Sequence, residues 1–463
     1  MNQLQRQVKG LIATTLLRMR RAGSAALALP GPDTADELIR LCDILLARRG
    51  EAWSTATAGE VLSGYARASR EERNRFLSIL AERYGPDSER LDQAIANYQA
   101  QHDAASMAEV HAASESRRQQ LIHELNQAEG GTLMLLKMRQ EGLADRANIA
   151  GFDALDGDFR QVLSSWFNRG FLVLRRIDWS SPASVLRKII EYEAVHEIQD
   201  WDDLRRRVEP PDRRCYAFFH PQIPEEPLIF VEVALTTGIP SSIQTLLDEN
   251  RSVTALPAPT TAVFYSISNC QDGLRGVPFG SFLIKQVAET LKSELPSLKA
   301  FVTLSPVPNF AGWLARERNA DSSEYIQPAE QVALATLDAQ SWQNTDGVRE
   351  TLLSLVARYL LNARGKDHRP LDSVARFHLG NGAELAQIHW MADTSPKGLK
   401  QSFGVMVNYL YDLKRIEHNQ AALARGTVAA SAAVHKLARA DSHNHNGLLS
   451  RWRSAAEPAI EPS

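Results

Sequence analysis

A glycine-containing segment in the C-terminal half is the stretch most informative about chemistry. A predicted strand begins near Phe264 and leads into a loop with Gly273, Gly276 and Gly280, and a predicted helix begins at Ser281. Glycines let the backbone approach a bulky anion, and the start of a helix offers free amides and a partial positive charge. The loop has no Gly-Lys-Ser/Thr ending, so it is not a Walker P-loop. The spacing favours diphosphate binding, although a purely structural turn would use the same glycines.

Ser305 is the second candidate, because it directly follows the last residue of the next predicted strand, residues 300–304. Pro306 and Pro308 follow it, and they force an extended exit from the strand that holds the serine in a fixed place. A serine at the end of a strand, beside a loop suited to diphosphate, is well placed to contact a bound ligand. The alternative is a serine that serves only the turn.

His378 is the third candidate and lies close to Gly380, where a helix is expected to end. From this position an imidazole can reach a cleft, and histidine is the natural proton donor near neutral pH. A hydrogen-bonded structural histidine fits the same pattern equally well. Tyr409 and Tyr411 lie in an apolar run and could be core residues. The other histidines do not have the spacing of metal ligands.

These candidates need a sheet to position them, and the hydrophobic periodicity changes accordingly along the chain. Residues 34–168 have helical periodicity, and Ser69 with Glu72 forms a capping box at one helix start. This half contains no candidate nucleophile, metal cluster or glycine loop, so we expect it to serve packing or oligomerisation.

From about residue 169 the period changes to two or to continuous apolar runs, which predict strands. The predicted strands are residues 171–174, 215–219, 228–235, 262–267 and 300–304, and residues 281–295 form a predicted helix between the last two. This alternation indicates a central sheet with helices on its faces. We therefore expect an α+β protein with a helical domain over 1–168 and a sheet domain over 169–463.

Composition excludes several classes of protein. The 463 residues include 52 basic and 55 acidic side chains, a net charge of −3, which argues against a general nucleic-acid coat protein. The sequence contains no run of 18 or more apolar residues, so no membrane span is predicted. The three cysteines are widely spaced, which excludes a disulfide scaffold and a cysteine-only zinc site and fits a reduced, cytosol-like compartment.

The two ends of the chain carry weaker signals. Several arginines and a lysine, but no acidic residue, precede Asp33. This composition fits a mobile N-terminal helix, which we favour, or an organelle transit peptide. The last residues, Glu461-Pro462-Ser463, are not a peroxisomal address of the Ser-Lys-Leu kind. Residues from about 420 onward predict a loose helix or a flexible tail.

Short runs distributed over residues 160–412 resemble the malonyl-CoA decarboxylase family and occur in the family's order. The stronger runs are Arg213-Arg-Cys-Tyr216, Glu226-Pro-Leu228, Val233-Ala-Leu-Thr236, Phe264-Tyr-Ser-Ile-Ser268, Gly273-Leu274, Phe282-Leu-Ile-Lys285, Leu304-Ser-Pro306, Phe377-His378, Asn381-Gly-Ala383 and Trp390-Met-Ala-Asp393. The weaker runs are Trp166-Phe167, Gly170-Phe-Leu172 and Glu193-Ala-Val-His196. No single motif carries the resemblance, and their combination is highly specific.

The resemblance implies a helical N-terminal domain followed by a catalytic domain of the GNAT-type acetyltransferase fold. By the motif match, Ser305 and His378 form the catalytic pair, with Ser266 and Tyr411 in supporting roles. The segment that would hold the pantetheine and diphosphate of coenzyme A comprises Arg275, Gly276, Val277, Pro278, Phe279, Gly280 and Ser281. Some relatives have a glutamate where Pro278 stands, so any role of that carboxylate is absent here or supplied elsewhere.

The implied reaction converts malonyl-CoA to acetyl-CoA and carbon dioxide through a thioester enolate. Because the thioester itself accepts the electrons, neither a metal nor an organic cofactor is required. We expect His378 to protonate the enolate carbon and Ser305 to orient the malonyl carboxylate. Ser266 and Tyr411 would donate hydrogen bonds around the acyl group. Positioned donors of this kind are typically worth ~3–4 kcal/mol each.

Two other functions remain open at this point: a GNAT-type acyl-CoA acyltransferase and a non-catalytic acyl-CoA sensor. The resemblance further implies a homo-oligomer, for example a tetramer, with no nucleic-acid or membrane partner and a cytoplasmic location. The physiological role, in fatty acid metabolism or in malonate metabolism, is not specified by the residues.

Overall fold

The computed structural model describes residues 34–47, 51–250, 258–277, 283–338, 342–344 and 347–439. The chain divides into two compact units between Val162 and Leu163. The basic N-terminal segment and residues 440–463 lie outside the described residues. The expected domain boundary near residue 168 stays a prediction. It lies just after a helix, Phe152–Trp166, and the division between the two units falls inside that helix.

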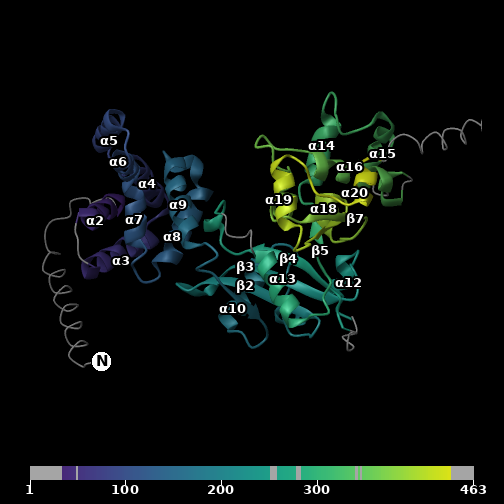
Figure 1. Ribbon diagram of the computed structural model, residues 1–463. Coiled ribbons are helices and arrows are strands. Elements are labelled where there is room, and N and C mark those ends of the chain that lie inside the picture. Colours follow the sequence, from purple (N-terminus) through teal and green to yellow (C-terminus); the bar gives the residue numbers. More distant parts are fainter. Residues whose placement is uncertain are drawn as a thin grey trace, which may run out of the picture. The chain divides into compact units, whose positions relative to one another are not determined.

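The first unit is helical, and no strand occurs among its described residues (Figure 1). Its helices are α2 (Thr34–Ala47), α3 (Glu51–Arg67), α4 (Arg70–Arg83), α5 (Ser88–Gln101), α6 (Ala104–Ser114), α7 (Arg117–Leu125), α8 (Gly131–Ala144), the 3-10 helix η1 (Arg146–Asn148) and α9 (Phe152–Trp166), which runs past the division.

The start of α4 confirms the predicted capping box. The Ser69 hydroxyl accepts from the Glu72 amide, and the Glu72 carboxylate accepts from the Ser69 amide, so two otherwise unpaired donors are satisfied. Phe76 and Leu80 lie one turn apart on the buried face of this helix, and Tyr84 follows them at its C-terminal end. Their spacing of four residues explains why one face of α4 is apolar.

The second unit is built on a mixed, eight-stranded sheet. Its strands are β1 (Val173–Ile177), β2 (Arg213–His220), β3 (Ile223–Thr236), β4 (Thr261–Asn269), β5 (Ala300–Thr303), β6 (Ser305–Pro306), β7 (Glu384–His389) and β8 (Met406–Leu410). The order is β1-β2-β3-β4-β5-β8-β6, and β7 pairs with β8. The expected α+β class, with helices followed by a mixed-sheet domain, is confirmed, and the GNAT type of that domain stays a prediction.

The strands β4 and β5 diverge, and this divergence decides where the candidate residues lie. They pair in parallel from Thr261 with Ala300 to Phe264 with Thr303. Beyond that point β4 pairs only with β3 among the described residues, whereas Ser305 of β6 pairs with Val407 of β8. The two strands therefore separate after Phe264 and Thr303, and the sheet is open between their ends.

Helices cover the sheet and complete the unit. On one face, α10 (Ala183–Tyr192) and α11 (Trp201–Val208) bury Val185, Ile189 and Leu204 against Phe219 and Phe230. The remaining helices are α12 (Ile243–Leu247), η2 (Asp272–Leu274), α13 (Leu283–Glu294), α14 (Phe310–Asn319), η3 (Pro328–Glu330), α15 (Gln331–Ala335), η4 (Thr336–Asp338), η5 (Trp342–Asn344), α16 (Val348–Asn362), α17 (Ser373–Gly380), α18 (Pro396–Ser402), α19 (Ile416–Ala424) and α20 (Ala432–Arg439).

Of the C-terminal segment, for which a loose helix or a flexible tail was expected from about residue 420, the described part is largely helical. Residues up to 439 include the end of α19 and all of α20, whose Val434 is fully buried. Helix α20 packs on α16 and β7. Its apolar face was not assigned to a core from the sequence, because the partners of that face lie far away along the chain. In the described part of the chain, no helix is long and apolar enough to cross a membrane.

Candidate active site

The structure brings Ser305 and His378 into contact. Ser305 begins β6, and His378 lies in the last turn of α17. The Ser305 Oγ is 3.2 Å from the His378 Nε2, although 73 residues separate the two in the chain. Both side chains are buried. The two candidates taken separately from the sequence therefore belong to one site.

The position of α17 follows from its N-terminal cap. Asp372 accepts hydrogen bonds from the backbone amides of Val374 and Ala375, both at 2.9 Å. Its other carboxylate oxygen accepts from the Asn309 amide at 3.5 Å, four residues beyond Ser305. One carboxylate thus caps the helix that carries His378 and ties it to the segment that carries Ser305.

Tyr411 completes the contacts of the imidazole. Its hydroxyl lies 2.8 Å from the His378 Nδ1, so both ring nitrogens have a hydrogen-bond partner. The ring of Tyr409 stacks on the imidazole with a centroid distance of 4.6 Å and an interplanar angle of 23°. The Ser305 hydroxyl in turn donates to the Thr303 Oγ1 at 2.8 Å. A continuous chain of polar groups therefore runs from Tyr411 to Thr303.

Burial controls the charge of this chain. It lowers the pKa of His378 to about 3, because the cation loses its hydration and no described carboxylate compensates. The same desolvation raises the pKa of Tyr411 well above its ordinary value, and its interaction with the Asn381 amide opposes that rise. At neutral pH the site therefore consists of a neutral imidazole, a phenol and two aliphatic hydroxyls.

Ser266 occupies a different hydrogen-bonded group on β4. Its hydroxyl donates to the Glu193 carboxylate, at 2.8 Å to Oε1 and 2.7 Å to Oε2. Ser268 donates to the same carboxylate at 3.2 Å, and so do the amides of Val195 and His196, each at 2.8 Å. Among the residues that the structure describes, no hydrogen bond joins Ser266 to Ser305, His378 or Tyr411. The single proton of Ser266 is directed to Glu193 here.

The predicted coenzyme loop is described only in its first part. Gly276 has a φ of 77°, a left-handed conformation that favours glycine. Arg275 is exposed and lies 3.3 Å from Asp272, while the Val277 side chain is buried. The predicted residues Pro278, Phe279, Gly280 and Ser281 lie outside the described residues, so their role stays a prediction. Helix α13 follows at Leu283, close to the expected start.

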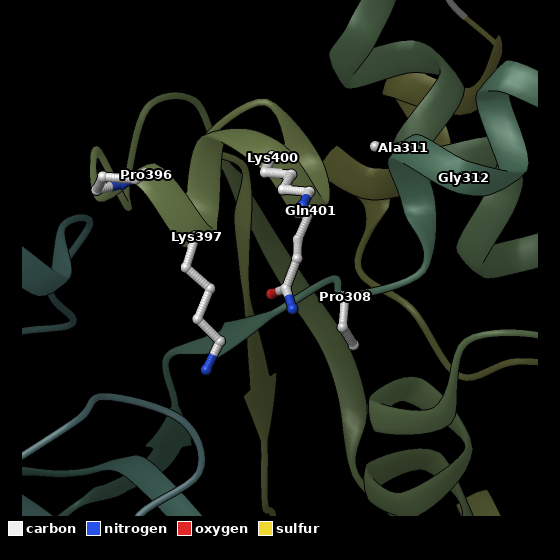
Figure 2. A pocket seen from close by; sticks show the side chains of 7 residues that line it. All are labelled: Pro308, Ala311, Gly312, Pro396, Lys397, Lys400 and Gln401. Carbon is white, nitrogen blue, oxygen red and sulfur yellow. The ribbon is translucent and has the colours of Figure 1, made fainter.

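A cavity of about 540 Å³ lies between the start of α14 and α18. One of its lining residues, Pro308, follows Ser305 by three residues in the chain. Figure 2 shows Lys397 and Gln401 projecting from α18, with Pro308 and the first turn of α14 across the space. The cavity is lined by Pro308, Ala311, Gly312, Pro396, Lys397, Lys400 and Gln401. The Lys397 Nζ donates to the carbonyls of Ala194 and Val195, at 2.6 and 3.0 Å. The two lysines give this cavity a positive potential.

Several contributors were not assigned to the site from the sequence. Thr303 and Tyr409 each lie two residues before a predicted site residue, and in a strand this spacing places side chains on the same face. That spacing was the available signal for both. Glu193 and Asn381 begin two of the runs that carry the family resemblance, but nothing local marked either as a partner of the site.

The arrangement has the groups for proton transfer and for hydrogen bonding to a small acyl group. A neutral imidazole holds one transferable proton, and the neighbouring hydroxyls are donors in a site largely removed from water. In the described ranges, no group of three or more histidine, cysteine, aspartate or glutamate side chains could hold a metal ion.

Two family models match the chain in sequence. The malonyl-CoA decarboxylase C-terminal domain matches residues 170–447, and the malonyl-CoA decarboxylase N-terminal domain matches residues 84–167. Among curated proteins, the chain is 41% identical over 337 residues to the mitochondrial malonyl-CoA decarboxylase of Anser anser anser. That match covers 66% of this chain and 66% of the relative.

Solved structures of two bacterial proteins resemble this chain over most of its length. The malonyl-CoA decarboxylase from Rhodopseudomonas palustris is 52% identical, with a TM-score of 0.82, and the match covers 88% of this chain and 100% of that one. The malonyl-CoA decarboxylase from Agrobacterium vitis is 50% identical, with a TM-score of 0.83 and coverage of 87% and 99%.

Proposed function

Because the chain belongs to the malonyl-CoA decarboxylase family, we propose that it is a carboxy-lyase that converts malonyl-CoA to acetyl-CoA and carbon dioxide. The observation that carries this proposal is the buried contact between Ser305 and His378, with Tyr411 on the other ring nitrogen. These groups can hold an acyl thioester and supply a proton, and they include no strong base that would activate an acceptor alcohol or amine.

The reaction needs three contributions from the protein. The bond to the malonyl carboxylate must stand perpendicular to the thioester carbonyl, so that its electrons flow into the carbonyl as carbon dioxide leaves. Hydrogen-bond donors must then face the oxygen on which charge develops. Finally, a proton must reach the enolate carbon. Each turnover consumes one proton, since a carboxylate and a proton become carbon dioxide and a carbon–hydrogen bond.

The site residues divide these tasks. His378 protonates the enolate carbon from its neutral form, and burial keeps it neutral at the pH of the reaction. Neutral imidazoles act as donors to carbonyl groups in other enzymes when their pKa is lowered. The Ser305 hydroxyl orients the malonyl carboxylate, because its only described imidazole neighbour, His378, is a weak base whose pKa burial lowers to about 3, and a nucleophilic or basic serine needs a stronger one. Ser266 donates to Glu193, and its expected hydrogen bond to the acyl group stays a prediction.

The diverging ends of β4 and β5 are the place for the pantetheine arm. An extended chain with two amides can add to a sheet where two strands separate, because each amide matches the spacing of a strand residue. From there the thioester would reach Ser305 at the start of β6. The coenzyme diphosphate would lie on the loop from Arg275 to Ser281, which precedes α13. The positive cavity between α14 and α18 adds to the attraction for this anionic substrate.

The deciding experiment is incubation of the purified full-length chain with malonyl-CoA and no added acceptor. Stoichiometric acetyl-CoA and carbon dioxide are the expected products. Turnover only in the presence of an amine or alcohol would instead identify an acyltransferase. Retained coenzyme binding with no product over hours would identify a sensor.

We also propose that the reaction needs neither a metal nor an organic cofactor, because the thioester itself accepts the electrons of the breaking bond. Dialysis against a chelator before the assay should leave the rate unchanged. A rate that falls and is restored by a divalent cation would contradict this part of the proposal.

The assembly and the setting of the enzyme are further proposals. We infer a homo-oligomer whose subunits contact one another through the helical unit, because none of the predicted site residues lies in that unit. Size-exclusion chromatography with light scattering measures the mass of the assembly. We place it in a reducing compartment such as the cytoplasm, in line with three buried free thiols. There it would remove malonyl-CoA from fatty acid or malonate metabolism.

A further inference from the structure

The strand that leads to Ser305 is interrupted at Leu304, between β5 and β6. β5 pairs with β8 at Val302, and β6 pairs with β8 again at Ser305. Both pairs belong to one register, in which Leu304 would stand opposite Asn408, but these two described residues do not pair. The ladder between this strand and β8 is therefore broken directly before Ser305.

Side chains replace a backbone bond at this break. Thr303 stands opposite Tyr409 in the register, so in an unbroken antiparallel ladder the Tyr409 amide would donate to the Thr303 carbonyl. Here the Tyr409 amide donates to the Thr303 Oγ1 at 3.1 Å, and the Asn408 Nδ2 donates to the Thr303 carbonyl at 2.6 Å. Thr303 and Asn408 are both fully buried. The carbonyl and the hydroxyl of Thr303 thus have separate donors on β8.

This exchange places the Thr303 hydroxyl beside the candidate catalytic serine. Thr303 and Ser305 lie two residues apart on one face of the strand, and their hydroxyl oxygens are 2.8 Å apart. Without Asn408 the buried Thr303 carbonyl would be unpaired, and the Tyr409 amide would return to it, because an unpaired buried carbonyl is costly. Asn408 therefore fixes the position of the oxygen that neighbours Ser305.

His389 of β7 fixes the orientation of the Asn408 amide in turn. A carbonyl oxygen only accepts, so the Asn408 group that faces Thr303 must be the NH₂ group, and the Oδ1 must point the other way. The Asn408 Oδ1 contacts the His389 Nε2, and that nitrogen must carry a proton because an amide oxygen also only accepts. The direction of both bonds follows from the atom types alone.

We propose that Asn408, oriented by His389, is a positioning residue that holds Thr303 and Ser305 in the geometry that the reaction needs. This assignment rests on the proposed function for its effect on rate. A displacement of about 1 Å at a reacting group can cost roughly 10²-fold in rate, and hydrogen bonds behind the reacting groups prevent such displacements. Because neither Asn408 nor His389 binds the substrate, their loss should lower kcat and leave KM nearly unchanged.

A pair of variants at His389 tests the orientation of the amide. In His389→Gln the new amide donates to the Asn408 Oδ1, and kcat should stay within about threefold of the unaltered chain. In His389→Glu a carboxylate faces the Oδ1, so the Asn408 amide turns over and its oxygen faces the Thr303 carbonyl. We expect kcat to be at least about tenfold lower than in His389→Gln, with KM changed less than about threefold. Equal kcat values in the two variants would overturn the proposal.

Gln387→Glu is the matched control for the added charge. Gln387 stands opposite Asn408 in the register of β7 with β8, but its side chain is exposed. This variant should leave kcat unchanged, and a loss as large as that in His389→Glu would count against the proposal. Asn408→Asp removes the donor to the Thr303 carbonyl and should also lower kcat at least about tenfold. The pair at His389 decides the question even if Asn408→Asp does not fold.

A measurement without turnover separates this proposal from the proposed function. In the full-length chain labelled with ¹⁵N-histidine, the His389 signals are those lost in His389→Gln, and we expect its Nε2 to carry a proton. An Nε2 without a proton in the unaltered chain would overturn the proposal. An unaltered chain that makes no acetyl-CoA but has this proton would refute the decarboxylase proposal and support the arrangement of His389 and Asn408.

Discussion

The charge state of His378 leads to a quantitative prediction about pH. A histidine with the ordinary pKa of 6.5 would be about 97% protonated at pH 5, and a rate that needs the neutral ring would fall roughly 25-fold between pH 7 and pH 5. Burial lowers the pKa of His378 to about 3, so that only about 1% is protonated at pH 5. We therefore expect kcat/KM to change less than about twofold over this range on account of His378.

The assay should quantify malonyl-CoA and acetyl-CoA in quenched samples by chromatography, so that no coupling enzyme responds to the pH. Circular dichroism at each pH shows whether the chain stays folded. His196 is a suitable control, because burial lowers its pKa to about 4 and its amide donates to Glu193 rather than to the catalytic group. His196→Asn should keep the flat profile of the unaltered chain.

The reasoning fails if kcat/KM has an acid limb with a midpoint near pH 6.5. Such a limb, retained in His196→Asn and missing from the residual activity of His378→Asn, would mean that His378 titrates like an exposed histidine. A rate that instead rises toward pH 5 would mean that the imidazolium is the acid, and the neutral mechanism would be wrong.

Four further outcomes follow from the same contacts. Ser305→Ala should lower kcat by roughly 10²–10³-fold with KM changed less than about threefold, in steady-state kinetics; a kcat within about twofold of the unaltered chain would remove Ser305 from catalysis. Lys400→Glu should raise KM for malonyl-CoA severalfold, and added salt should shrink this difference; equal KM values at low salt would exclude the cavity from substrate attraction. Glu193→Gln should lower the unfolding free energy by about 1–3 kcal/mol, because the new amide faces donors from Ser266 and Ser268, and an unchanged melting temperature would contradict this. Since the pKa of folded His378 lies below that of the unfolded state, the unfolded chain binds the additional proton, and stability should fall as the pH drops from 6.5 by up to about 1.4 kcal/mol per unit; the melting temperature of His378→Asn should fall less steeply.

Local patterns were sufficient for much of the sheet. The strands β2 to β5 were predicted with errors of a few residues at their ends, because alternation and apolar runs are properties of neighbouring residues. β1 was placed two residues too early, at the exposed Phe171. β7 and β8 were missed. β7 is largely half-exposed and has no clear alternation, and the Tyr409 run in β8 read equally well as general core.

The sequence by itself determined the residue types and their order: a serine at a strand end, a histidine before a helix-ending glycine, and a set of runs that identifies the family. It also determined the change from helical to strand periodicity. Only the tertiary structure decided that Ser266 donates to Glu193, that Thr303 accepts from Ser305, and that His378 is neutral. The physical reason is that hydrogen-bond partners 73 residues apart come from separate elements, and desolvation sums over all the atoms that surround a group.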